Sequence, residues 1–282
     1  AIIFSDILIP CTAMGQQLDF AKDHGPILSN PVRSSKDLNK LKIPDVKKDL
    51  GFVGDAINIT RKSLSEAHAM IGFAGAPFTV ASYMVEGGGT KTYAEIKKLL
   101  YNEPDTFYHL LDLITETTSE YLLMQIDSGA DCLMLFDTWA NQISADEYAE
   151  KVLPHIRRLL SLVKSKCKSP IIYYPGGWTE IYQDIRDLEI DVIAVDWRFN
   201  LSRTIKALNS LSMKVSVQGN LDPQILMGPE KLIREKVGRI LREARESYGH
   251  IFNVGHGLTP ATPIDSIKTV IDEIRKTEKQ FL

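Results

Sequence analysis

The stretch IGFAGAPFTVASYMVEGGGTKTY, residues 71–93, decides how the rest of the chain is interpreted. Residues 70–74 form an apolar run that is long enough for a buried parallel strand. Gly75, Pro77 and the triple glycine at 87–89 are unfavourable inside a continuous helix. We therefore expect one strand that runs out into a long loop. The simpler alternative is an ordinary strand-to-helix connection with flexible glycines.

Three side chains of this stretch have the chemistry of a binding site. Phe78 offers a flat apolar surface, Tyr83 a phenol and Glu86 a carboxylate, all near the end of one strand. We expect the glycines and Pro77 to form one wall of a cleft, to which Tyr83 contributes its phenol.

The bulk properties of the chain exclude several classes of protein. The 282 residues, 44% of them hydrophobic, are enough for one large domain with a sizeable core. The net charge of −3 and the scattered Lys and Arg residues argue against a nucleic-acid partner. No apolar run approaches the ~20 residues of a membrane span, and no signal peptide is visible. The three separated cysteines, Cys11, Cys132 and Cys167, indicate reduced thiols in a cytoplasmic protein, without a disulfide or zinc.

Predicted strands and helices alternate along the whole chain. We expect strands near residues 4, 72, 133, 172, 193, 216 and 252. Such alternation is typical of parallel βαβ units, and a closed (β/α)8 TIM barrel needs one strand more than these. An open doubly wound sheet is the alternative, but no GxGxxG motif follows a strand. We therefore predict a single (β/α)8 barrel domain over residues 1–282, an α/β fold.

The start of the chain looks like the inside of a strand. Ala1–Leu8 is apolar except for Ser5 and Asp6, and it has no polar lead-in. We expect the natural chain to begin earlier, so that the first βα unit is missing from this sequence. A carboxylate in an apolar run needs partners. Asp6 therefore either faces a site at the end of the strand or belongs to a structural hydrogen-bonded pair.

Local signals predict where several helices begin. Pro44 suits the first position of a helix that continues to Ile57. Ser144 and Glu147 have the spacing of a capping box. Residues 179–188 are expected to be helical, and Ser202 is expected to cap the helix that follows.

Several predicted strands lead directly into polar residues that could form a site. They are Asp6, Asp137-Thr138, Asp196-Trp197, Gln218-Gly219-Asn220 and His256. Each alone could be a cap or a satisfied polar group, but the ends of barrel strands lie on one face, where active sites form. The chain has no GxSxG elbow and no Walker loop, and His256 has no obvious companion for a metal. A carboxylate, a phenol, a hydroxyl and an imidazole remain, and such a set can stabilise a transient cation without a cofactor.

Sequence blocks along almost the whole chain resemble those of the uroporphyrinogen decarboxylase family. The blocks are FSDIL at 4–8, GFAGAPFT at 72–79, YMVEGGG at 83–89, LFDTWA at 135–140, DW at 196–197, QGNLDP at 218–223 and NVGHG at 253–257. This resemblance implies a (β/α)8 barrel that removes the four acetate carboxyls of uroporphyrinogen III to give coproporphyrinogen III in haem biosynthesis. It implies no metal or prosthetic group, a cytoplasmic location and a homodimer.

The resemblance also implies roles for five residues. Asp6 matches the family's aspartate that faces the pyrrole NH groups. Tyr83 and His256 match residues that bind substrate carboxylates, and with Asp6 they are the expected catalytic residues. Thr138 stands where many members carry serine, and Phe73 matches an aromatic residue near the macrocycle. The family's arginine-bearing RQAGR block, which precedes the aspartate strand, is absent from this sequence.

Two alternatives stay open at this point. Related corrinoid:thiol methyltransferases share the barrel but hold zinc with a His-x-Cys pair and a later Cys. The candidate positions here are Tyr173-Tyr174-Pro175 and Gly255-His256-Gly257, and Cys167 lies before a strand. The second alternative is an inactive barrel that serves as a binding protein, against which the retained Asp6, Tyr83 and His256 argue.

Overall fold

The computed structural model describes residues 1–21, 25–177 and 180–278. The chain divides into two compact units. Unit 1 comprises residues 1–176 and 187–189, and unit 2 comprises residues 177–186 and 190 onwards. None of the described helices is both long and apolar enough to cross a membrane.

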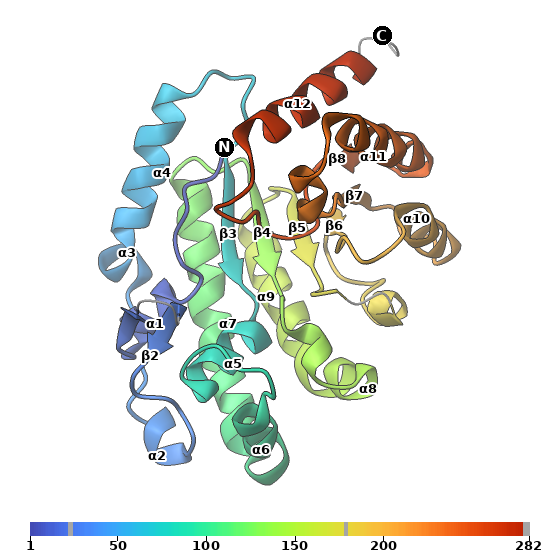
Figure 1. The fold of residues 1–282 in the computed structure, drawn as a ribbon. Coiled ribbons are helices and arrows are strands. Elements are labelled where there is room, and N and C mark those ends of the chain that lie inside the picture. Colours follow the sequence, from blue (N-terminus) through green and yellow to red (C-terminus); the bar gives the residue numbers. More distant parts are fainter. Residues whose placement is uncertain (22–24, 178–179, 279–282) are drawn as a thin grey trace. The chain divides into compact units, whose positions relative to one another are not determined.

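Parallel strands and covering helices make up unit 1. Its described residues contain the parallel strands β3 (Ile71–Gly75), β4 (Cys132–Phe136) and β5 (Ile171–Tyr174). The longer helices are α4 (Gly51–Ser63), α5 (Pro77–Glu86), α6 (Ala94–Asn102), α7 (Pro104–Asp127) and α9 (Leu153–Lys166). Figure 1 shows β3, β4 and β5 in a row, and α7 packs against β3, β4 and α9.

The remaining elements of unit 1 are short. They are α1 (Ile9–Met14), the antiparallel hairpin β1 (Leu18–Ala21) and β2 (Gly25–Leu28), α2 (Ser35–Leu38), α3 (Val46–Asp49), a 3-10 turn at Ala140–Gln142, α8 (Ala145–Glu147) and a π-helical turn at Tyr148–Val152.

Unit 2 repeats the alternation of strand and helix. In its described part the parallel strands are β6 (Val192–Ala194), β7 (Ser216–Gln218) and β8 (His250–Ile251). The helices are α10 (Leu201–Ser210), α11 (Glu230–Glu243) and α12 (Ile264–Glu278), with 3-10 turns at Glu180–Gln183, Pro223–Met227 and Ala244–Glu246. In Figure 1, α11 lies beside α12 and α10, and it packs against both. The predicted α/β architecture with parallel strands is thereby confirmed.

The register of unit 1 aligns the carboxyl ends of its parallel strands. Gly75 pairs with Phe136, and Phe136 pairs with Tyr174. The backbone N–H of Ala76 donates to the carbonyl of Phe136, and that of Asp137 donates to the carbonyl of Tyr174. The residues that follow β3, β4 and β5 therefore leave the sheet at the same level.

The structure corrects the prediction of a long loop after β3. Residues 77–86 form the helix α5, which begins with Pro77 in its first turn and ends at Gly87. Proline is tolerated at the start of a helix because its missing N–H would have no partner there. Gly87 has a φ of +85°, the left-handed conformation that commonly ends helices and that glycine adopts without strain. The residues interpreted as helix breakers are the first and last signals of a short helix.

The predicted strand at Ala1–Leu8 is reduced to a single bridge. Ile2 pairs with Ile71, and the carbonyl of Ala1 accepts a hydrogen bond from the backbone of Ile71. The next outward-facing backbone groups of β3, those of Phe73, are bonded instead to the side-chain amide of Gln125 on α7. Because Gln125 occupies the place of a further strand residue, the segment leaves the edge of β3, and Phe4 is 84% exposed.

Three predicted helix starts also change. The helix expected from Pro44 is split at Leu50 into α3 and α4. Asn200, not Ser202, caps α10, because its side-chain oxygen accepts from the backbone N–H of Arg203 at 2.9 Å. Of the helix expected over residues 179–188, only Glu180–Gln183 form a 3-10 turn and residues 184–188 are non-helical turn and bend, while its first residue lies outside the described part. The capping box of Ser144 and Glu147 is confirmed, with the hydroxyl of Ser144 accepting from the backbone of Glu147.

Candidate active site

The residue after β4, Asp137, is completely buried among hydroxyl groups. The hydroxyl of Thr79 donates to Oδ1 at 2.8 Å. The hydroxyls of Tyr148 and Tyr173 both donate to Oδ2, the latter at 3.3 Å, and the two phenol oxygens lie 2.6 Å apart. Thr79 also accepts from the backbone N–H of Trp139 at 3.1 Å. This cluster therefore fixes the turn that carries Thr138 and Trp139.

Burial dominates the electrostatics of this cluster. Burial raises the pKa of Asp137 above its ordinary value, while the hydrogen bonds from Tyr148, Thr79 and Tyr173 act in the opposite direction. The pKa values of both tyrosines are raised well above the ordinary value by burial and by the charge of Asp137. Both phenols therefore stay protonated and remain hydrogen-bond donors to the carboxylate at neutral pH.

Asp6 has a more open environment than Asp137. It is half-buried, and its Oδ1 accepts the backbone N–H of Leu8 at 2.9 Å. Among the described residues, nothing in the protein bonds to its Oδ2. One carboxylate oxygen of Asp6 is thus left without a bond to the described part of the protein.

Tyr83 lies within the electrostatic reach of Asp6. The phenol is half-buried, and its pKa is raised by burial and also by the negative charge of Asp6. A hydrogen bond with the side chain of Trp139 acts in the opposite direction. The ring centroids of Tyr83 and Trp139 are 6.2 Å apart, and Tyr93 packs on the same indole at 5.5 Å. The structure therefore brings the segment that carries Asp6, the helix α5 and the turn after β4 close together.

A cavity of about 290 Å³ lies beside Tyr83. It is lined by Ser82, Tyr83, Gly88, Gly89, Thr90, Lys91, Tyr93 and Trp139. Its walls are thus the end of α5, the glycine-rich loop and the indole of Trp139.

The position of Tyr83 depends on how the end of α5 is held. A helix leaves its last four carbonyls without partners inside the helix. The carbonyl of Tyr83 accepts from Gly87, and that of Met84 accepts from Val32 and from the side chain of Gln16. The segment around β1 and β2 therefore clamps the end of α5.

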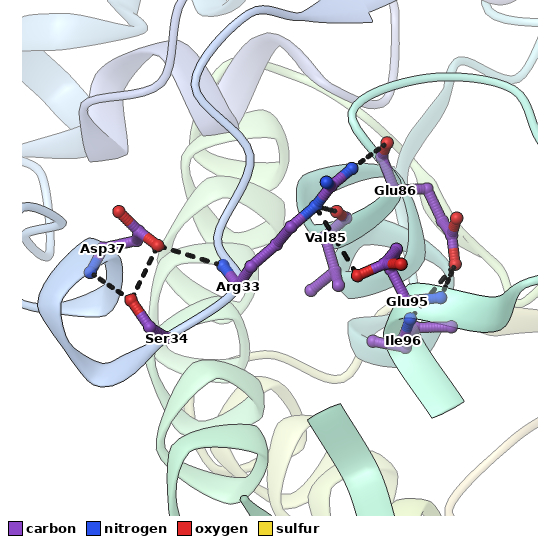
Figure 2. A network of polar contacts seen from close by, with 7 residues as sticks. All are labelled: Arg33, Ser34, Asp37, Val85, Glu86, Glu95 and Ile96. Carbon is purple, nitrogen blue, oxygen red and sulfur yellow. Dashed lines mark hydrogen bonds and ion pairs between the residues drawn. The ribbon is translucent and has the colours of Figure 1, made fainter. Parts of the chain in front are cut away.

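Arg33 completes this clamp, as Figure 2 shows. Its guanidinium donates to the carbonyls of Val85, at 3.3 Å, and Glu86, at 3.4 Å. The carboxylate of Glu95 lies 3.9 Å from the same group. Glu86 in turn accepts the backbone N–H groups of Glu95 and Ile96 at the start of α6. Arg33 and Glu86 thus join the end of α5 to the start of α6 across the glycine-rich loop.

The other predicted site residues of unit 1 have clear places. Phe73 is half-buried on β3 and meets the ring of Phe136 edge to face at 5.9 Å. Thr138 is half-buried in the turn between Asp137 and Trp139. Glu86 and Phe78, which the sequence suggested as site groups, have structural positions, because Glu86 caps α6 and Phe78 is fully buried against Phe107.

In unit 2, the residue after β6 is again a buried aspartate. Asp196 is 3% exposed, and its carboxylate accepts from both the backbone N–H and the guanidinium of Arg198, at 2.9 and 2.7 Å. The guanidinium lies over the ring of Trp197 at 4.9 Å. Asn220 donates to the carbonyls of Asp196 and Phe199 and so fixes this loop.

His256 is exposed in the loop after β8. The preceding Gly255 is buried, and a Cβ atom there would overlap the backbone of Trp197. Only glycine allows this close approach, so the loop that carries His256 lies directly against Trp197. His256 and the unit 1 residues belong to different units, and its membership of one site with them stays a prediction.

Sequence reasoning missed several residues of this site. Tyr148 and Tyr173 lie 11 and 36 residues from Asp137, and no local pattern links them to it. Trp139 carried a signal, because it follows a polar strand end directly. The only sequence signal for Arg33 was its positive charge within a segment rich in glycine and proline.

Comparison with known proteins gives a consistent result for the whole chain. The family model described as uroporphyrinogen decarboxylase matches residues 1–277. Uroporphyrinogen decarboxylases from Pelobacter propionicus and Trichlorobacter lovleyi are both 40% identical to it. Each alignment covers 99% of this chain, and the chain spans 80% and 81% of the two relatives.

A solved structure of a methyltransferase from Methanosarcina mazei has the same fold. It superposes with a TM-score of 0.82 at 19% sequence identity, over 99% of this chain and 80% of that one. A B12-independent methionine synthase from Shewanella sp. W3-18-1 is more distant, with a TM-score of 0.55 at 12% identity, over 96% of this chain and 77% of that one. These two likenesses concern the fold alone.

Proposed function

The chain belongs to the uroporphyrinogen decarboxylase family, and from this premise we propose that it converts uroporphyrinogen III to coproporphyrinogen III. The match over residues 1–277, together with 40% identity to named decarboxylases, carries the proposal. The reaction is a carboxy-lyase reaction that removes four acetate carboxyls as carbon dioxide. It uses no metal or prosthetic group.

Each decarboxylation passes through a positively charged pyrrole ring. A proton adds to a ring carbon, and the bond between the acetate methylene and its carboxyl then breaks. The electron pair of that bond neutralises the ring as an exocyclic methylene, and carbon dioxide leaves. The methylene carbon then takes up a proton to become a methyl group, and the ring carbon releases the proton that it gained in the first step, which restores the neutral pyrrole. A fixed anion near the pyrrole NH groups stabilises the charged ring without reorganising during the reaction.

We assign that anion to Asp6. Its half-buried carboxylate is oriented by the backbone N–H of Leu8, and its Oδ2 has no protein partner within the described chain. An oxygen with this freedom can accept pyrrole N–H groups. Among the described strand-end carboxylates, Asp137 and Asp196 are already committed to protein donors.

The remaining predicted residues bind the anionic side chains and the flat face of the substrate. Tyr83 has a raised pKa and so stays a phenol that can donate to an acetate or propionate carboxylate. Thr138 supplies a hydroxyl, His256 an imidazole for a carboxylate, and Phe73 an apolar surface for the macrocycle. The finer expectations, a cytoplasmic homodimer without a nucleic-acid or membrane partner, belong to the same proposal.

Anaerobic incubation with uroporphyrinogen III tests the proposal directly. We expect products with seven, six, five and finally four carboxyl groups, resolved by chromatography after oxidation to porphyrins. Retention of all eight carboxyl groups under these conditions would reject the decarboxylase.

The methyltransferase alternative gives a different outcome in a metal assay. Stoichiometric zinc in the purified protein would favour it, because the alternative needs a thiolate-rich zinc site. Across the described ranges, no cluster of three His, Cys, Asp or Glu side chains has the arrangement of a metal site. For the proposed decarboxylase we expect turnover that EDTA treatment leaves unchanged.

A further inference from the structure

The cavity beside Tyr83 contains groups that the proposed roles do not use. Of the residues that line it, only Tyr83 belongs to the predicted site. The others come from the glycine-rich loop, from Tyr93 and from Trp139. They line the cavity together with Tyr83. The negative charge of Asp6 contributes to the raised pKa of this phenol.

Three aromatic rings give this cavity rigid walls. Trp139 packs against both Tyr83 and Tyr93, and the Thr79 hydroxyl holds its backbone. Tyr93 is buried and has a φ of +51°, the left-handed conformation that a bulky residue rarely adopts. Such a conformation costs on the order of 1–3 kcal/mol and persists only where the surroundings fix it. The turn into α6 is therefore held so that the ring of Tyr93 completes the wall.

Lys91 provides the positive charge of this cavity. It is the one cationic side chain among the residues that line it, and it is exposed. Within the described chain, Lys91 forms no ion pair or hydrogen bond through its ammonium group. The neighbouring Thr90 accepts the backbone N–H of Thr92 and keeps its own hydroxyl proton as a donor. The cavity thus offers an uncommitted cation and hydroxyl donors between aromatic walls.

We propose that this cavity binds one carboxylate-bearing side chain of the tetrapyrrole substrate, with Lys91 as its charge partner. The inference rests on the proposed function and extends it to a residue outside the predicted site. The volume of about 290 Å³ is at the lower end of the range of ligand pockets, which begins near 300 Å³. It suits one side chain with the edge of its pyrrole ring, and it is too small for the whole macrocycle.

The charge distribution supports this arrangement. The substrate carries a carboxylate on every side chain, while the anion assigned to its centre is Asp6. A side chain that enters the cavity beside Tyr83 meets the ammonium group of Lys91. Lysine is a compact charge on a flexible stem, and such a group can follow a carboxylate without fixing its orientation. Lys91 is therefore expected to contribute to binding rather than to the chemical step.

The test compares Lys91→Ala with a matched control, Lys98→Ala. Lys98 is also exposed, belongs to the following helix α6 and does not line the cavity. For Lys91→Ala we expect KM for uroporphyrinogen III to rise about tenfold, the effect of losing roughly 1.4 kcal/mol of binding, with kcat within about twofold. Lys91→Arg should restore most of the affinity, and Lys91→Glu should weaken it further. Lys98→Ala should match the wild type.

The dependence on side-chain type refines the result. Coproporphyrinogen III keeps only the propionates, so an equal rise of its inhibition constant in Lys91→Ala indicates that the cavity takes a propionate. A rise confined to uroporphyrinogen III indicates an acetate. Both results support the proposal, and the weakening should diminish at high salt because exposed charges are screened.

Two outcomes separate this inference from the function on which it rests. If the wild-type protein releases no carbon dioxide from uroporphyrinogen III, the proposed function fails. If the wild type is active and Lys91→Ala behaves as Lys98→Ala does, the function stands and the role of Lys91 is wrong. A loss confined to kcat would likewise overturn it, since it would assign Lys91 to the chemical step.

Discussion

Asp6 and Asp137 are two aspartates of unit 1 with opposite surroundings. Asp137 is fully buried and receives hydroxyl donors from Thr79, Tyr148 and Tyr173. Asp6 is half-buried and uses one oxygen for the backbone of Leu8. The comparison teaches that a carboxylate after an apolar segment is a structural group where the protein supplies all its donors. It is available to a ligand where one oxygen stays open.

The largest expected effect is that of Asp6→Asn on turnover. Asparagine keeps an oxygen for the N–H of Leu8 but removes the charge that would stabilise the protonated pyrrole. We expect kcat to fall by a factor of about 10³, the upper range for loss of one electrostatic group in an active site. The free energy of unfolding should change by less than about 0.5 kcal/mol, as for a mild surface substitution. Anaerobic turnover and urea denaturation measure the two quantities.

The matched control for Asp6→Asn is Asp55→Asn. Asp55 is an exposed aspartate on α4, and its variant should retain wild-type turnover. A near-normal kcat in Asp6→Asn would remove Asp6 from its proposed role. Equal losses in both variants would point to a general charge effect.

The sequence was informative where structure depends on local chemistry. The alternation of strands and helices and the capping box at Ser144 were both predicted and are confirmed. The loop predicted after β3 was wrong because Pro77 and Gly87 were interpreted as helix breakers rather than helix ends. The confirmed capping box and the wrongly predicted loop both depend on residues that lie close together in the sequence.

The hydroxyl cluster around Asp137 depends on distant parts of the chain. Its tyrosines come from the π-helical turn and from β5, which meet only after folding. The amide of Gln125 against Phe73 and the clamp of Arg33 on α5 are of the same kind. Sequence patterns therefore identified Asp6 and Asp137 as candidate residues. Only the structure identified the hydrogen-bond donors that distinguish the two.

The second prediction concerns Asp137→Ala, which removes the buried carboxylate that has a structural role. The substitution leaves three buried hydroxyls without their acceptor and creates a small cavity. We expect the free energy of unfolding to fall by about 3 kcal/mol, because unsatisfied buried polar groups cost about 1–3 kcal/mol each and Tyr148 and Tyr173 retain each other. Urea denaturation measures this loss. Turnover per folded molecule should fall far less than in Asp6→Asn, and a loss as large would break the comparison.

The third prediction separates the contribution of the Thr79 hydroxyl to stability from that of the side chain's volume. Thr79→Val keeps the volume but removes the donor to Asp137 and the acceptor for the backbone of Trp139. We expect a loss of about 2 kcal/mol in the free energy of unfolding. Thr79→Ser, the matched control, keeps the hydroxyl and should lose less than about 1 kcal/mol for one methyl group. Equal losses in the two variants would show that packing, and not the hydrogen bonds, stabilises this turn.

The smallest expected effect is the pH dependence of stability that Asp137 contributes. Its pKa is raised in the folded protein, so the folded state holds the proton more tightly than the unfolded state does. The contribution of Asp137 to stability is therefore greatest below its ordinary pKa of 3.8 and declines as the pH rises through the folded-state value. Asp137→Asn lacks this titration. The free energy of unfolding of the wild type, minus that of Asp137→Asn, should thus be larger near pH 4 than near pH 7 when both are measured in urea. A difference that grows with pH would mean that the hydroxyl donors outweigh burial, and Asp137 would then resemble a ligand-binding carboxylate more closely than its burial suggests.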